Sequence, residues 1–169
     1  MPKNATWRSL PEPTSHKIAS MAGIITVLAA VALTAWPQRG DCPVDNPETS
    51  VQIGDAELQV EIAADNRARH CGLAFRDKLP ADTGMLFVYG DEDYRSMWMK
   101  NTYIPLDMVF VRADGTVASI ARDTEPLSLR SVASSETVRF VLELNAGTAR
   151  RLHIDEASYL EWQPRDGER

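Results

Sequence analysis

An uncharged run of 19 residues, Ile18–Trp36, divides this chain into two parts of different character. At about 1.5 Å per residue, a helix of this run would span roughly 28 Å, close to the ~30 Å hydrocarbon core of a bilayer. Lys3, Arg8 and Lys17 precede the run, whereas the segment that follows it is acidic. By the positive-inside rule, we expect the N-terminus in the cytoplasm and residues 40–169 on the other side of the membrane.

This run can act as an uncleaved transmembrane anchor or as a cleaved signal peptide. Its length favours an anchor, whereas Ala30-Val31-Ala32 has the small residues of a cleavage site, although inside the apolar run. A buried core helix is a third alternative, but the run has no polar face. We therefore predict a periplasmic or otherwise extracytoplasmic protein, either anchored in the inner membrane or secreted after cleavage.

The rest of the chain has the composition of one globular domain, because 44% of all residues are apolar and 25% are charged. We predict a signal or anchor over residues 1–39, a linker over 40–54, a single compact domain over 55–163 and a tail over 164–169. Residues 1–39 hold four basic residues and one acidic residue, so the chain's net charge of −6 becomes −9 for the remainder. An acidic domain without a basic stripe is not expected to bind nucleic acid.

Hydrophobic patterning in the predicted domain is that of strands. Leu58, Val60 and Ile62 alternate with polar residues, and an apolar run follows at 85–89. The predicted strands are 57–62, 85–89, 94–100, 107–112, 116–121, 140–144 and 159–162. Two short helices are predicted, one over 66–71 capped by Asp65 and one after Asn145 as its cap. We expect a mainly β fold, an antiparallel β-sandwich or open barrel of about seven strands, with residues 122–137 as a long loop.

No motif in the sequence names a reaction. Phosphate-binding loops, dinucleotide fingerprints and HExxH are absent, and two cysteines with three scattered histidines cannot form a zinc cage. We therefore expect no metal site and no cofactor. Cys42 and Cys71 can form a disulfide in an oxidising compartment, closing a loop of about 30 residues; the alternative is a free Cys71 buried beside Leu73.

Four strings of residues carry a family resemblance: RHCGLAFR at 69–76, GMLFV at 84–88, WMKNTYIPLDM at 98–108 and VLELNAG at 141–147. In this order and spacing, the chain resembles the domain of unknown function 192 family (DUF192) over about residues 55–160. The resemblance implies a compact, mostly β domain and brings no established reaction, ligand or catalytic residue. The family usually reads RGLM in the first string, so Cys71 is a feature of this chain.

The WMKNTYIPLDM string predicts a hairpin. If Lys100 pairs with Asp107, then Trp98 pairs with Val109 on the same face, while the methionines face the core. A polar pocket with an aromatic wall would then comprise Trp98, Lys100, Asn101 and Asp107. The structural alternative is a salt bridge with a turn-stabilising Asn101.

Arg76 is a further candidate, because its guanidinium can bind a ligand carboxylate or phosphate; the alternative is a surface ion pair. The missing motifs, the small size and the N-terminal anchor favour a non-enzymatic module of the cell envelope that binds a small molecule or a partner protein. We expect it to contact the membrane only through the N-terminal segment. We expect a monomer. The alternative is a small hydrolase or transferase that uses Lys100, Asp107 and Glu143 in a polar cleft, so whether the domain is an enzyme stays open.

Overall fold

The computed structural model describes Cys42 and residues 44–162. The uncharged run Ile18–Trp36 and the predicted tail, residues 164–169, lie outside the described residues, so the anchor or signal assignment stays a prediction. Among the described residues, no helix is long and apolar enough to cross a membrane.

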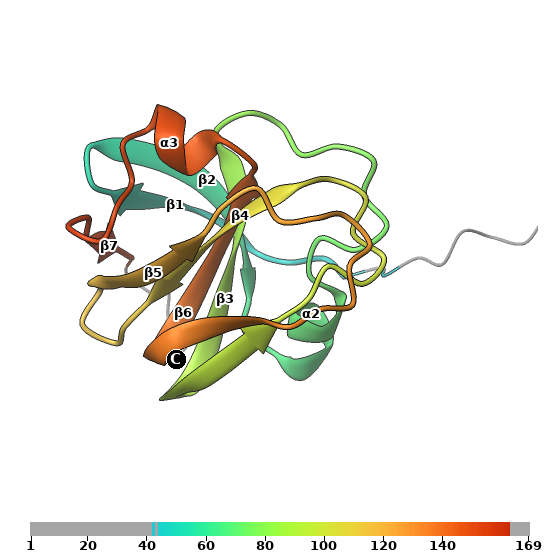
Figure 1. Cartoon of the computed structure of the whole chain (residues 1–169), viewed down its shortest axis with the longest axis horizontal. Coiled ribbons are helices and arrows are strands. Elements are labelled where there is room, and N and C mark those ends of the chain that lie inside the picture. Colours follow the sequence, from blue (N-terminus) through green and yellow to red (C-terminus); the bar gives the residue numbers. More distant parts are fainter. Residues whose placement is uncertain (1–41, 43, 163–169) are drawn as a thin grey trace, which may run out of the picture. The chain divides into compact units, whose positions relative to one another are not determined.

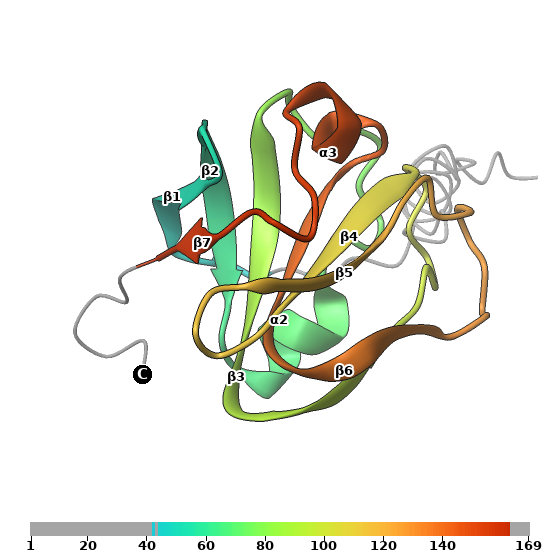
Figure 2. The same cartoon turned by 60° about the vertical axis from the view of Figure 1, so that its left-hand side comes forward.

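Seven strands form one sheet that curls into a half-barrel (Figure 1, Figure 2). They are β1 (Glu48–Ile53), β2 (Ala56–Ala63), β3 (Thr83–Met97), β4 (Leu106–Val111), β5 (Val117–Ala121), β6 (Val132–Asn145) and β7 (Leu160–Glu161). Their order across the sheet is β5-β4-β6-β3-β2-β1-β7. β2 and β3 pair in parallel, and the other neighbours pair antiparallel. The mainly β prediction is confirmed. One pair departs from the predicted antiparallel arrangement, and the single curled sheet is closer to the predicted open barrel than to a sandwich.

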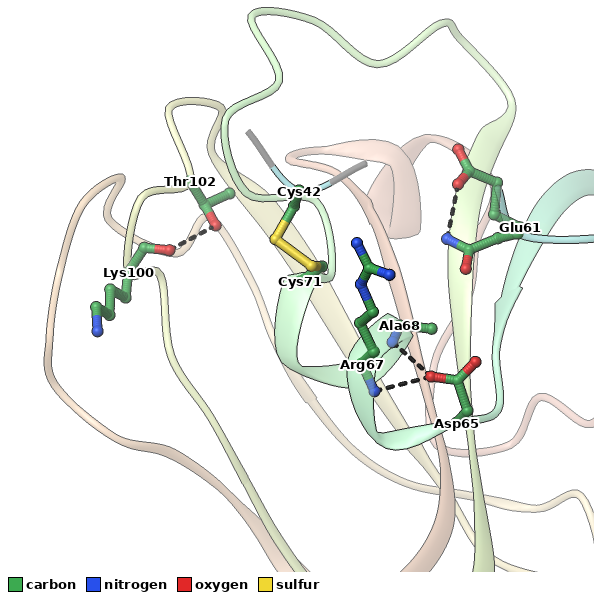
Figure 3. The surroundings of a disulfide bond; sticks show 9 residues. Cys42, Glu61, Asp65, Arg67, Ala68, Cys71, Lys100 and Thr102 are labelled. Carbon is green, nitrogen blue, oxygen red and sulfur yellow. Dashed lines mark hydrogen bonds between the residues drawn. A yellow bond between two sulfur atoms is a disulfide. The ribbon is translucent and has the colours of Figure 1, made fainter. Parts of the chain in front are cut away.

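Helix α2 (Asn66–Cys71) forms where the sequence predicts it. The Asp65 side chain accepts hydrogen bonds from the backbone N–H groups of Arg67 and Ala68, both at 2.8 Å (Figure 3). The helix ends at Gly72, whose φ of +52° is costly for residues with a Cβ. The predicted disulfide between Cys42 and Cys71 is present and ties the segment before β1 to the end of α2 (Figure 3).

Both faces of the sheet are buried, because side chains alternate along each strand. Along β6, Phe140, Leu142 and Leu144 belong to the first core cluster, beneath α3 (Thr148–Arg151). Val141 belongs to the second cluster, beneath α2. The second cluster also contains Met97, Met99 and Met108, so the prediction that these methionines face the core is confirmed.

The predicted hairpin between residues 94–100 and 107–112 does not form. β6 lies between β3 and β4 and pairs with both, so Asp107 lies opposite Leu144, not opposite Lys100. The segments 85–89 and 94–97 are parts of the single 15-residue strand β3. The alternation of side chains between the two faces of a strand is the same whichever strand lies beside it, and here β6, from later in the chain, lies between β3 and β4.

Three further predictions are wrong in detail. β1 lies within the predicted linker of residues 40–54, and β6 begins at Val132, within the predicted loop. Asn145 is the last residue of β6 and does not cap a helix, since the N-cap of α3 is Gly147. The Asn145 amide instead donates to the backbone carbonyls of Leu79 and Pro80. For Asn145, a long-range partner thus replaces the local role that the residue type suggests.

Candidate functional site

A cavity of about 360 Å³ lies between α2 and the second face of the sheet. Its volume is near the lower end of the range for small-molecule sites. It is lined by α2 and the residues after it, by β3, by the segment that follows β3, and by one residue of β6. The lining residues used below are Arg69, His70, Leu73, Phe87, Tyr89, Ser96, Met97, Trp98, Lys100 and Glu143.

Glu143 is the one acidic residue of this lining. It lies in the middle of the sheet, in register with Met85 on β3 and Met108 on β4, and is 4% exposed. No described residue donates a hydrogen bond to its carboxyl group, and burial alone raises its pKa to about 8. A buried carboxyl without a partner is costly for the fold, and its place in a cavity makes it a candidate functional group.

Tyr89 forms one side of the cavity, between two guanidinium groups. The Cζ atoms of Arg69 and Arg95 lie 5.2 and 4.1 Å from its ring centroid. Burial raises the pKa of Tyr89, although the two arginines act in the opposite direction. Both arginines already have acceptors: Arg69 donates to Val88 O at 2.8 Å, and Arg95 pairs with Asp91 at 2.8 Å. These guanidinium groups therefore hold Tyr89 in place.

The mouth of the cavity is formed by Trp98 and Lys100. Trp98 is 47% exposed, and the Lys100 Nζ lies 5.2 Å from its ring centroid. The His70 ring packs edge-on against the Trp98 ring, with the two ring centroids 6.4 Å apart. Within the described residues, neither the Lys100 ammonium nor the His70 ring has an acidic partner. The mouth thus carries basic groups, and the floor carries an acid.

The structure brings together only part of the predicted site. Trp98 and Lys100 line the cavity, and Asn101 lines a side pocket of about 60 Å³ with Cys42. Arg76 forms an ion pair with Glu61, whose pKa this guanidinium lowers, and does not reach the cavity.

Asp107 lies on the opposite face of the sheet from the cavity and is fully buried. Its carboxylate accepts hydrogen bonds from the backbone N–H groups of Asp123 at 3.0 Å and Ala149 at 2.9 Å. It therefore holds the start of α3 and the segment after β5 against the sheet. The predicted cleft of Lys100, Asp107 and Glu143 is wrong for Asp107, because strand alternation separates it from Glu143.

The sequence predicts Glu143 only as part of the enzymatic alternative, and Tyr89 and Phe87 are not among the predicted site residues. A signal for Glu143 was present: it is the single acid in the apolar strand 140–144. An acid flanked on both sides by apolar residues lies either on a solvent-exposed face of the strand or in the interior, where it is a candidate functional group. The sequence does not show that β6 is a central strand of the sheet, and it is this central position that buries Glu143.

The fold and the cavity define a class: a small domain with a curled, mixed sheet and one helix-covered cavity containing a buried acid. The DUF192 family, described as "Uncharacterized ACR, COG1430", matches residues 49–162. The chain belongs to this family, which confirms the resemblance carried by its motifs. A search of curated proteins finds no match.

Two solved structures are similar to this chain. A protein from Sinorhizobium meliloti 1021, described as a proposed transcription regulator, is 41% identical and has a TM-score of 0.68, covering 72% of this chain and 97% of its own. A protein of unknown function from Novosphingobium aromaticivorans DSM 12444 is 32% identical with a TM-score of 0.65, covering 68% of this chain and 85% of its own.

Proposed function

We propose that this domain is a non-enzymatic module of the cell envelope that binds a small molecule in the cavity beneath α2. The observation that carries the proposal is the Glu143 carboxyl, which lies in that cavity without a partner among the described residues. Ligand sites combine apolar walls with a few fixed polar groups, and Phe87, Met97 and Trp98 supply such walls here. An envelope partner protein is the alternative occupant, reaching the exposed Trp98.

The location rests on the sequence and on the disulfide. The run Ile18–Trp36 and its charge asymmetry favour export of residues 40–169. The Cys42–Cys71 bond supports this location, because disulfides persist in oxidising compartments. We do not extend transcriptional regulation to this chain, since its net charge is −6 and its described helices have six and four residues.

Ligand-induced thermal stabilisation of the purified full-length chain tests the binding function. A ligand that binds only the native state raises the melting temperature. Ser96→Trp places a large ring at an exposed position that lines the cavity, and Gln59→Trp places the same ring at an exposed position of β2 away from it. Compounds from a metabolite library should stabilise the wild type and Gln59→Trp but not Ser96→Trp. A library without a hit, or hits that stabilise all three proteins equally, would count against a binding cavity.

A second candidate function is general acid–base catalysis by Glu143 in a small hydrolase or transferase. One observation favours it: burial raises the pKa of Glu143 to about 8. A general acid or base is most effective when its pKa lies near the working pH. Lys100 at the mouth would then orient the substrate. Turnover of a bound library compound by the wild type and its loss in Glu143→Gln, with binding retained, would favour the enzyme over the binding module.

A further inference from the structure

The acidic and basic residues of the cavity lie at different depths. Glu143 lies at the floor, within the sheet, whereas Lys100 and His70 are exposed at the mouth. Leu73, Phe87 and Met97, which are buried apolar residues, line the cavity as well. A complementary ligand therefore has a positive inner end, an apolar stem and a negative outer end.

We propose that the cavity binds a small zwitterion, with a primary ammonium group against Glu143 and a carboxylate or similar anion beside Lys100. This inference rests on the proposed binding function and specifies its ligand class. A neutral hydrogen-bonding ligand would be served equally by an amide side chain. A carboxyl group differs from an amide in its ability to carry negative charge, and a cationic ligand makes use of that difference.

The basic groups around the cavity do not contradict an inward ammonium. Arg69 donates to the carbonyls of Ala64 and Val88, and Arg95 is paired with Asp91. Both guanidinium groups also pack against the Tyr89 ring. Lys100 and His70 remain, and both lie at the mouth, where an anionic outer end of the ligand would meet them.

Proton release accompanies the binding of an ammonium group. In the protein without ligand, Glu143 is about nine-tenths protonated at pH 7, because its pKa is about 8. An ion pair with an ammonium group requires the carboxylate, so the proton must leave when the ligand binds. Affinity should therefore rise roughly tenfold per pH unit between pH 5 and 7 and level off above pH 8. The titratable and charged groups that surround the cavity besides Glu143 are Arg69, His70, Tyr89, Arg95 and Lys100.

Isothermal titration of the full-length oxidised chain with three matched probe series tests this ligand class. The zwitterions run from β-alanine to 6-aminohexanoate, and the n-alkylamines and n-alkanoates have the same chain lengths. We expect one of the zwitterions to bind best, with about 0.9 proton released per ligand at pH 7. Glu143→Gln should weaken this binding by at least about 30-fold, since a desolvated ion pair is lost. His70→Gln should leave this proton release unchanged, because Glu143 is the group that loses the proton.

The outer end is tested by Lys100→Met, with Lys78→Met as the control because Lys78 is exposed and does not line the cavity. Lys100→Met should weaken the zwitterion up to about fivefold and leave the alkylamine unchanged, as expected for an exposed ion pair. Tighter binding of the alkanoates, proton uptake, or unchanged binding in Glu143→Gln would overturn the zwitterion assignment. If none of the probes binds while other library compounds are excluded by Ser96→Trp, the ligand class is wrong and the binding function stands.

Discussion

Replacement of Glu143 by glutamine should change how the stability of the domain depends on pH. The folded-state pKa of Glu143 is raised to about 8 from the ordinary 4.5, because burial disfavours the charged form. Between these values the native state holds a proton that the unfolded chain releases. Since stability falls with pH wherever the native state binds more protons, the wild type should become less stable as pH rises from about 4.5 to 8.

The magnitude follows from the same two values. At 1.36 kcal/mol per pH unit, the full difference corresponds to about 5 kcal/mol, and about 4 kcal/mol of it falls between pH 5 and pH 9. A buried glutamine has its own desolvation cost, but that cost does not vary with pH. The free energy of unfolding of Glu143→Gln minus that of the wild type should therefore grow by about 4 kcal/mol over this interval.

Urea unfolding of the full-length oxidised chain at several pH values measures this difference. Glu57→Gln is the control, because it also removes one negative charge but at an exposed position of β2. Its curve should run parallel to that of the wild type. If the curve of Glu143→Gln is also parallel, the carboxyl has a solvated or cationic partner in the free protein, and the case for an unpartnered acid in the cavity fails.

Other perturbations have expected outcomes that the structure sets. Replacing Cys42 and Cys71 together by serine should lower the free energy of unfolding by about 3–4 kcal/mol in urea titrations, because the bond closes a loop with a sequence separation of 29. Asp107→Leu should lower the free energy of unfolding by about 3–5 kcal/mol, because it leaves two backbone N–H donors unpaired. Lys100→Met should lower it by at most about 1 kcal/mol. Since the two residues do not pair, the effects should add in the double variant to within about 0.5 kcal/mol, as measured by thermal or urea unfolding. A C-terminal reporter active only outside the cytoplasm should function when fused to the full chain, and activity of a cytoplasmic reporter there would contradict export.

Local features of the fold could be predicted from the sequence. Asp65 and Gly72 bound α2 as their residue types suggest, since capping and a left-handed terminus are decided within one turn of chain. Between β4 and β5 lies Asp114-Gly115, a dipeptide typical of hairpin turns, so this connection is also decided locally. The predicted number of strands equals the observed seven only because two errors compensate: the prediction omits β1 and divides β3 into two strands.

Strand order could not be predicted, because the alternation of side chains between the two faces of a strand does not identify the neighbouring strand. The side chains of 107–111 alternate between the faces in the same way beside β3 or beside β6, and long-range pairing with β6 determines the neighbour. The candidate site could be predicted only in part for the same reason, because strand order determines which side chains lie together. The distinctive string at 98–108 predicts Trp98 and Lys100, which line the cavity, but Arg76 and Asp107 do not line it.

Two buried acids on adjacent strands lead to the site. Asp107 and Glu143 occupy neighbouring register positions of β4 and β6 and point to opposite faces of the sheet. Two backbone N–H groups hydrogen-bond the Asp107 carboxylate, so its burial is accounted for by the fold. No described residue compensates the burial of Glu143, and its carboxyl lies where a cavity opens. A carboxyl group that has no partner among the described residues and lies at the floor of a cavity is best explained as a binding group for a ligand that enters the cavity.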